Sequence, residues 1–106
     1  MRTDTRLSQV KAYIDAYIAR DLTVVKLAAI AQLSPYHFAR LFKQSTGTTP
    51  HQYILHCRID RAQHLLRHSA LTLAEIAIAV GFCDQSHLTR RFKRIVGLTP
   101  TQFLNG

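Results

Sequence analysis

Arginines and lysines recur at equivalent places in a motif that the chain contains twice. The two copies lie fifty positions apart and read His37-Phe38-Ala39-Arg40-Leu41-Phe42-Lys43 and His87-Leu88-Thr89-Arg90-Arg91-Phe92-Lys93. Each copy continues into a glycine, a Thr-Pro pair and a glutamine. Guanidinium and ammonium groups bind phosphate and the edge of guanine. A chain that presents them twice is suited to a periodic anionic partner, and duplex DNA is the obvious one.

The overall charge favours the same kind of partner. Lys and Arg number 14 against 6 Asp and Glu, so the formal net charge is +8 and the pI is near 10.2. A surface of this sign attracts polyanions. Apolar residues make up 47% of the 106 residues, which is enough for one globular domain with its own core.

Membrane and secretory features are absent from the sequence. No run of about 18 apolar residues could span a bilayer, and the N-terminus lacks the layout of a signal peptide. The two cysteines, Cys57 and Cys83, are too few for a disulfide framework. We therefore expect a reduced, cytoplasmic protein without a membrane partner.

Helical periodicity runs through almost the whole chain. Apolar residues follow the spacing i, i+3, i+4, i+7 and i+8 along a first helix, at Val10, Tyr13, Ile14, Tyr17 and Ile18. No segment alternates with a period of two for long enough to indicate a strand. The prediction is an all-α fold of about seven helices, in which two helix-turn-helix subdomains are joined by a long connecting helix.

Helix start and stop residues place these elements. In the first copy they are Thr23 and Ser34-Pro35 as starts, with stops near Gln32 and at Gly47, and Thr49-Pro50 with Gln52 opens the connecting helix. In the second copy they are Thr72 with Glu75, Asp84, and Thr99-Pro100 with Gln102, with stops at Gly81 and Gly97. The expected parts are a first subdomain over about 7–48, the connecting helix over about 49–68 and a second subdomain over about 69–106.

The second helix of each pair separates an apolar face from a polar stripe. The faces expected to be buried carry Phe38, Leu41, Phe42 and Ser45 in the first copy and Leu88, Phe92 and Ile95 in the second. The stripes carry Tyr36, Ala39, Arg40 and Lys43 in the first and Gln85, Ser86, Thr89, Arg90 and Lys93 in the second. Arginine suits guanine, glutamine suits adenine, and threonine or alanine suits the thymine methyl. These nine residues are the candidate DNA-binding residues.

The length of the connecting helix supports two readers on one chain. The 20 residues from Thr49 to His68 span about 30 Å at 1.5 Å per residue. Major grooves recur on one face of B-DNA about every 34 Å. A rigid helix of this length could hold two recognition helices in successive grooves without a dimer, so we expect this chain to act as a monomer.

The combined motifs resemble the DNA-binding domain of the AraC/XylS family. The matching residues in the first copy are Ser34-Pro35, Phe38, Arg40, Phe42-Lys43, Gly47 and Thr49-Pro50, followed by Arg58-Ile59, Ala62 and Leu65-Leu66. Those in the second are Glu75-Ile76-Ala77, Val80-Gly81-Phe82, Arg90, Phe92-Lys93, Gly97 and Thr99-Pro100. The resemblance extends from about Leu7 to Phe103, so residues 1–106 are expected to form a single AraC-type domain.

This resemblance implies a bacterial transcription factor, in most cases an activator. Such proteins bind an asymmetric double-stranded site of about 20 base pairs, two half-sites one helical turn apart, and often contact RNA polymerase. It places base reading on Tyr36, Ala39 and Arg40 in the first reader and on Gln85, Ser86, Thr89 and Arg90 in the second. Family members also commonly carry a separate effector or oligomerisation domain.

Two residues depart from the family pattern. The family often has glycine where this chain has Gln32, which predicts a strained or altered end to that helix. Ala39 is a small residue at a reading position and offers at most a methyl contact. Recognition by the first reader therefore depends on Arg40 and Tyr36.

Other chemistries have less support in the sequence. His64 with His68 and Cys83 with His87 have an i, i+4 spacing found among zinc ligands, but nothing forces the two pairs together, so no metal site is expected. Cys57 is expected to fill part of the core, and a redox role for either thiol would require a depressed pKa. Glycine-rich phosphate loops, nucleophile elbows and paired carboxylates are absent, so we expect neither an enzyme nor a cofactor.

Two other functions remain open. A helical protein–protein interaction module would bind DNA weakly and without site preference. An RNA-binding protein would usually expose aromatic side chains for stacking, whereas most aromatic residues here fall on expected core stripes. Equal affinity for duplex DNA and single-stranded RNA would favour the second alternative.

Overall fold

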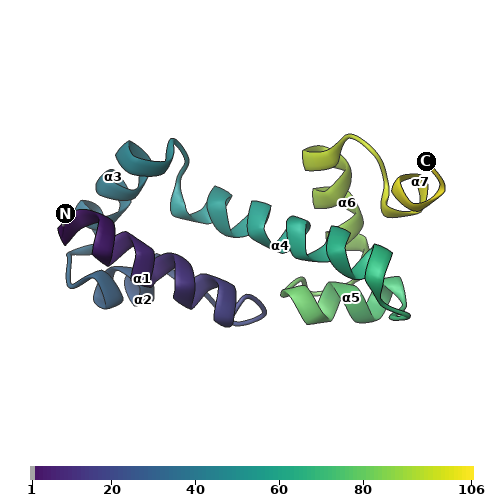
Figure 1. Ribbon diagram of the computed structural model, residues 1–106, viewed down its shortest axis with the longest axis horizontal. Coiled ribbons are helices and arrows are strands. Elements are labelled where there is room, and N and C mark those ends of the chain that lie inside the picture. Colours follow the sequence, from purple (N-terminus) through teal and green to yellow (C-terminus); the bar gives the residue numbers. More distant parts are fainter. Residues whose placement is uncertain (1) are drawn as a thin grey trace. The chain divides into compact units, whose positions relative to one another are not determined.

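The chain is all-α, as predicted. The computed structural model describes residues 2–106, with side chains from Thr5 onward, and contains seven helices and no strand within that range (Figure 1). They are α1 (Arg2–Ala16), α2 (Val24–Ala31), α3 (Pro35–Thr46), α4 (Pro50–His68), α5 (Leu73–Val80), α6 (Gln85–Val96) and α7 (Pro100–Asn105). The helix boundaries from α2 onward lie within a residue or two of those predicted from the start and stop residues.

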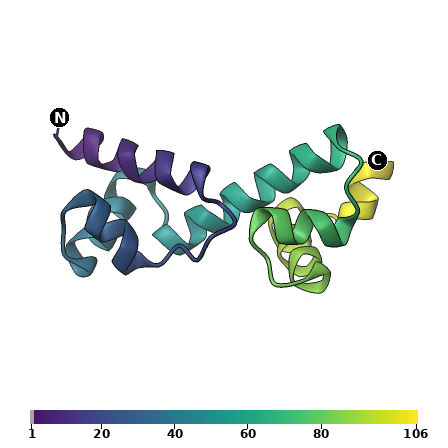
Figure 2. The same cartoon turned by 90° about the horizontal axis from the view of Figure 1, so that it is seen from below.

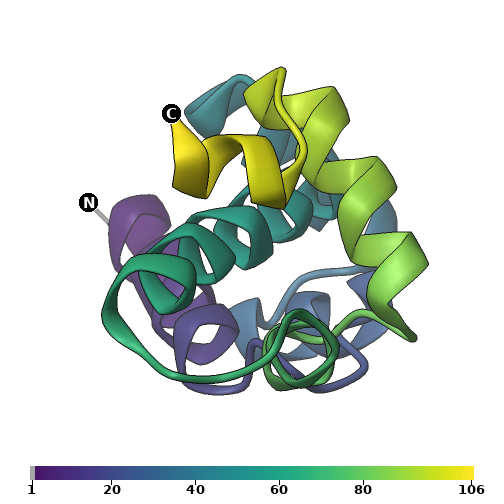
Figure 3. The same ribbon diagram turned by 90° about the vertical axis from the view of Figure 1, so that its right-hand side faces the viewer.

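Two compact units divide the chain. Unit 1 extends to Ile54 and unit 2 runs from Leu55 to Gly106, so the boundary falls within α4. In unit 1, α2 packs against both α1 and α3, as Figure 2 shows. In unit 2, α6 packs against α5 and α7, and Figure 3 shows α7 beside α6. Each unit thus contains one helix-turn-helix pair, α2–α3 or α5–α6, with an additional helix packed against it.

The cores of the two units repeat the same aromatic contact. In unit 1, the ring of Phe42 meets that of Tyr53 edge to face with centroids 5.2 Å apart. In unit 2, Phe92 meets Phe103 in the same way at 5.5 Å. The fully buried aromatic residues are Phe38, Phe42 and Phe92. The aromatic pair joins the recognition helix to the helix that follows it, and so fixes which face of α3 or α6 turns inward.

Side-chain caps begin the helices where the sequence predicted them. The Ser34 Oγ accepts the backbone N–H of His37 at 3.2 Å, and Asp84 Oδ1 accepts that of His87 at 2.8 Å. Capping boxes with both hydrogen bonds present start α4, α5 and α7, at Thr49–Gln52, Thr72–Glu75 and Thr99–Gln102. Each cap satisfies backbone N–H groups that have no partner within the helix and stabilises it by about 1 kcal/mol.

Replacing Glu75 with glutamine is expected to remove a pH-dependent part of the stability of unit 2. The pKa of Glu75 is lowered, first by the Thr72 backbone N–H, which donates to its carboxylate, and then by the Thr72 side chain. Because the folded pKa lies below the unfolded value of about 4.3, this stabilisation is complete at neutral pH and is lost as the pH falls through the folded pKa. Thermal unfolding from neutral to strongly acidic pH should show a smaller loss in Glu75→Gln than in the unchanged chain.

The other capping boxes provide the control for this experiment. Glutamine already occupies the equivalent position at Gln52 and Gln102. A Gln52→Glu variant should therefore acquire the additional acid sensitivity that Glu75→Gln loses. Identical pH profiles for all three chains would contradict the assignment.

Two apolar-stripe predictions are wrong at helix ends. Tyr17 lies beyond the end of α1 and is 41% exposed, whereas Ile18, which follows it, is buried as predicted. Ser45 is exposed, and the half-buried residue of that turn is Thr46. The inward face of α3 follows the i, i+4, i+8 row through Phe38 and Phe42, and the hydroxyl of Thr46 donates to the Phe42 carbonyl at 2.8 Å.

Gln32 ends α2 in a left-handed conformation, which is strained for a residue with a side chain, and strain was one of the two outcomes that its departure from glycine predicted. Its backbone has φ 59° and ψ 41°, and its N–H bonds the carbonyls of Ala28 and Ala29. The equivalent residue after α5 is Gly81, with φ 104°. Among residues 2–106, Gln32 is the one residue other than glycine that has a positive φ. A side chain at this position costs about 1–2 kcal/mol in conformational energy.

A Gln32→Gly variant is expected to be more stable than the unchanged chain by about 1 kcal/mol. Glycine removes the conformational cost, and its greater freedom in the unfolded chain offsets part of the gain. The reverse change, Gly81→Gln, should destabilise by more than this amount because φ at Gly81 lies well outside the left-handed minimum. Urea denaturation of both variants measures the two effects. A lower denaturation midpoint for Gln32→Gly would show that the glutamine side chain makes a compensating contact.

Candidate nucleic-acid interface

The polar stripe of α3 presents two of its candidate readers as a pair. Tyr36 is 68% exposed, and Arg40 and Lys43 are also exposed. The Arg40 guanidinium donates to the Tyr36 hydroxyl at 3.4 Å and lies over its ring at 5.8 Å from the centroid. Tyr36 and Arg40 are therefore in contact on the outer face of the helix.

The stripe of α6 presents more polar atoms. Gln85, Ser86, Arg90 and Lys93 are exposed, and Thr89 is half-buried. Ala39, at the position in α3 equivalent to Thr89, is half-buried as well. The structure thus places all nine candidate residues on α3 and α6, seven of them exposed and two at the edge of a stripe, next to the buried face.

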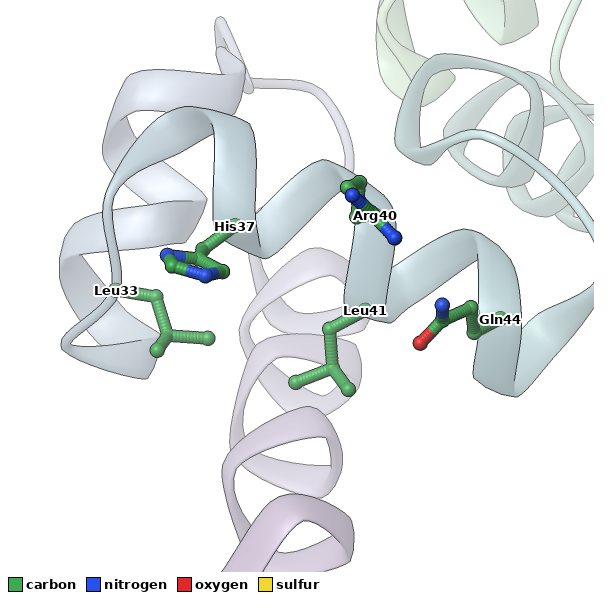
Figure 4. A pocket seen from close by; sticks show the side chains of 5 residues that line it. All are labelled: Leu33, His37, Arg40, Leu41 and Gln44. Atoms are coloured by element: carbon green, nitrogen blue, oxygen red, sulfur yellow. The ribbon is translucent and has the colours of Figure 1, made fainter.

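Both recognition helices also carry a shallow groove that the sequence prediction did not include. On unit 1 it is about 310 Å³ in volume and is lined by Leu33, His37, Arg40, Leu41 and Gln44 (Figure 4). In Figure 4 the side chains of Leu33 and Leu41 lie on the same side of α3, with the His37 ring near Leu33. On unit 2 the equivalent groove is about 280 Å³ and is lined by His87, Arg90, Arg91 and Arg94.

The residues that line the groove on α6 form a helical stripe of their own in the sequence. His87, Arg90, Arg91 and Arg94 follow the spacing i, i+3, i+4, i+7, which is that of a helical stripe. This stripe lies next to the one carrying Thr89 and Lys93 and shares Arg90 with it. Arg91 and Arg94 therefore extend the basic surface of α6.

Charge on the two recognition helices is positive but unequal. The α3 segment contains Arg40 and Lys43, whereas α6 contains Arg90, Arg91, Lys93 and Arg94, and neither segment contains an acidic residue. Asp84 stands at the cap of α6, where its carboxylate accepts a backbone N–H. Both helices therefore carry positive and no negative side chains, which favours the binding of phosphate.

The remaining candidate sites do not assemble into a metal centre. Within the described part of the chain, no three His, Cys, Asp or Glu residues are grouped so that they could hold a metal ion. The His64 and His68 rings on α4 have centroids 4.6 Å apart and planes tilted by 38°, and both residues are exposed. Cys57 is half-buried and Cys83 exposed, and no disulfide joins them.

No helix formed by the described residues combines the length and the apolar character needed to cross a membrane.

Known proteins share this arrangement. Residues 27–106 match the family model described as a helix-turn-helix domain. The chain is 35% identical over 103 residues to the transcriptional activator RhaS of Klebsiella pneumoniae. This match covers 97% of this chain and 37% of RhaS. It is also 35% identical over 97 residues to the MmsAB operon regulatory protein of Pseudomonas aeruginosa, covering 92% of this chain and 32% of that protein. The chain thus spans about a third of the length of these relatives.

Solved structures of helix-turn-helix proteins have the same fold as this chain. An AraC-type transcriptional regulator from Chromobacterium violaceum superimposes with a TM-score of 0.90 at 27% identity, covering 97% of this chain and 92% of that one. The DNA-binding domain of AdpA, solved in complex with a target DNA, superimposes with a TM-score of 0.89 at 31% identity, covering 94% and 90%. The fold and its two helix pairs define a helix-turn-helix DNA-binding domain. The chain belongs to the AraC/XylS family of such domains.

Proposed function

We propose that this chain is the sequence-specific double-stranded DNA-binding part of a transcription regulator, in which α3 and α6 enter successive major grooves. The observation that carries the proposal is the pair of exposed polar stripes at the same register on two recognition helices. The similarity to RhaS, a transcriptional activator, supports activation of transcription as the outcome. Contact with RNA polymerase and action of this chain as a monomer are part of the same proposal.

Base recognition is assigned to the exposed stripes. Arg40 and Arg90 are suited to bidentate contacts with guanine, and Gln85 to adenine. Ala39 and Thr89 supply methyl groups to thymine, and Tyr36 and Ser86 complete the two reading surfaces. Lys43 and Lys93 stand in the last turns of their helices and are assigned to phosphate, which positions the readers without specifying sequence.

The length of α4 supports two-groove binding by one chain. This helix has 19 residues and so extends about 29 Å, close to the interval of about 34 Å between major grooves on one face of B-DNA. The proposed site is asymmetric and about 20 base pairs long, because two different reading surfaces bind half-sites one helical turn apart. The subdomains over 7–48 and 69–106, joined by the connecting helix 49–68, are the proposed reading parts.

Selection from a pool of random duplexes tests this proposal most directly. The expected result is an asymmetric motif with two half-sites about ten base pairs apart. Footprinting the enriched sites at two salt concentrations separates specific from electrostatic binding. Enrichment of no sequence, with affinity that only declines as salt rises, would contradict sequence-specific recognition and favour a nonspecific electrostatic binder.

A further inference from the structure

The groove on α6 brings three guanidinium groups to one side of one helix. Arg90 and Arg94 are four positions apart, and Arg91 and Arg94 three, so their side chains are neighbours on the helix surface. With His87 they line one groove of about 280 Å³. Like charges at these spacings repel each other and destabilise an isolated helix. An anion bound between them would reverse the sign of that interaction.

The wall of the groove nearest the start of α6 is held in place. The backbone N–H of His87 donates to Asp84 Oδ1 at 2.8 Å. The imidazole of His87 meets the ring of Phe82 edge to face, with centroids 5.1 Å apart. Because Phe82 is buried, His87 is anchored to the core of unit 2. The arginines therefore stand beside a fixed wall.

The equivalent groove on unit 1 carries fewer arginines. His37 and Arg40 occupy the positions of His87 and Arg90, but Leu41 and Gln44 stand where unit 2 has Arg91 and Arg94. Leu41 and Arg91 are both half-buried, and Gln44 and Arg94 are both exposed. The two grooves thus share their position on the recognition helix, although His37 is exposed and His87 is half-buried. The difference that bears on anion binding is the charge that Arg91 and Arg94 add in unit 2.

We propose that the groove on α6 binds a phosphodiester group of the DNA backbone through Arg91 and Arg94, and that unit 1 lacks an equivalent clamp. The proposal rests on the proposed function, since the phosphate belongs to the duplex that α6 enters. A planar guanidinium matches phosphate oxygens in a two-bond geometry that lysine cannot provide. The second reader therefore supplies more of the sequence-independent, salt-dependent affinity than the first.

Salt titration of the single variants Arg91→Gln and Arg94→Gln tests the clamp. The slope of log K against log salt concentration is negative, and each lost phosphate contact lowers its magnitude by about 0.9. We expect that decrease for each variant, on both the selected duplex and a scrambled one, with the selected motif unchanged. The matched control is Lys11→Gln, which removes one charge from an exposed lysine of α1 whose ammonium lies over the Tyr53 ring; its slope should stay close to that of the unchanged chain.

Transfer of the clamp to unit 1 provides a gain-of-binding test. In the double variant Leu41→Arg with Gln44→Arg, the magnitude of this negative slope should rise by about 0.9 for each new phosphate contact. Unchanged slopes in the Arg91 and Arg94 variants would overturn the clamp, and so would an altered base preference in Arg91→Gln, which would make Arg91 a base reader. Failure of the proposed function is seen separately, as a selection with the unchanged chain that yields no motif. The slopes measured on scrambled DNA still test the clamp in that case.

Discussion

An Arg90→Ala variant is expected to lose about 1–3 kcal/mol of binding free energy on its selected site and to relax specificity at one base position. Arg90 is exposed on α6 at the same register as Arg40 on α3. Its removal would take away both hydrogen bonds of the proposed bidentate guanine contact, whereas the proposed backbone contacts of the remaining basic residues of α6 would be kept. Selection with the variant should therefore return a motif degenerate at that position and unchanged elsewhere.

The Arg90→Lys variant separates base reading from charge. Lysine keeps the positive charge but not the planar fork, so base preference should weaken while the salt dependence of binding stays as it was. Competition between duplexes that differ at the one base pair measures this preference directly. A motif that Arg90→Ala leaves intact would reassign Arg90 to the phosphate groove that it also lines.

Replacing Phe92 with alanine is expected to destabilise unit 2 by about 3–5 kcal/mol. The Phe92 ring is fully buried and lies edge to face against Phe103, so truncation leaves a cavity and removes an aromatic contact. A loss of this size is a large part of the roughly 5–15 kcal/mol by which domains are stable. Circular dichroism during urea denaturation measures the change in the free energy of unfolding.

The repeat supplies the control variants for Phe92. Phe42→Ala removes the equivalent buried ring, which meets Tyr53, and should cost a similar amount in unit 1. Leu104→Ala removes a side chain that is 51% exposed and should change stability by less than about 0.5 kcal/mol. A cost below about 1 kcal/mol for Phe92→Ala would mean that neighbouring side chains collapse into the space and that the core of unit 2 is loosely packed.

Local chemistry accounts for what could be predicted from the sequence. Ser34, Thr72 and Asp84 were correctly assigned as caps because the cap and its backbone partner are only three residues apart. The strained end of α2 could also be predicted, because the sequence alone shows that Gln32 stands where the family often has glycine. The internal repeat reinforced each assignment by showing it twice.

Features that depend on packing were predicted less well. The sequence pattern placed Ser45 on the buried face of α3, whereas the structure exposes Ser45 and half-buries Thr46. The grooves beside α3 and α6 depend on which half-buried residues flank the recognition helix, so Arg91 and Arg94 were not identified as candidates. Sequence periodicity defines a face to within about one residue, and a groove lies at the edge of such a face.

The division of the chain into two sequence-contiguous units also bears on how it is made. Unit 1 is complete once Ile54 has been added, and helical units with local contacts fold in microseconds to milliseconds. Synthesis at about 5–20 residues per second leaves several seconds before the last residue of unit 2 is joined. We therefore expect the first reader to be folded at the ribosome while the second is still being translated, so that the two similar sequences do not compete for each other's helices.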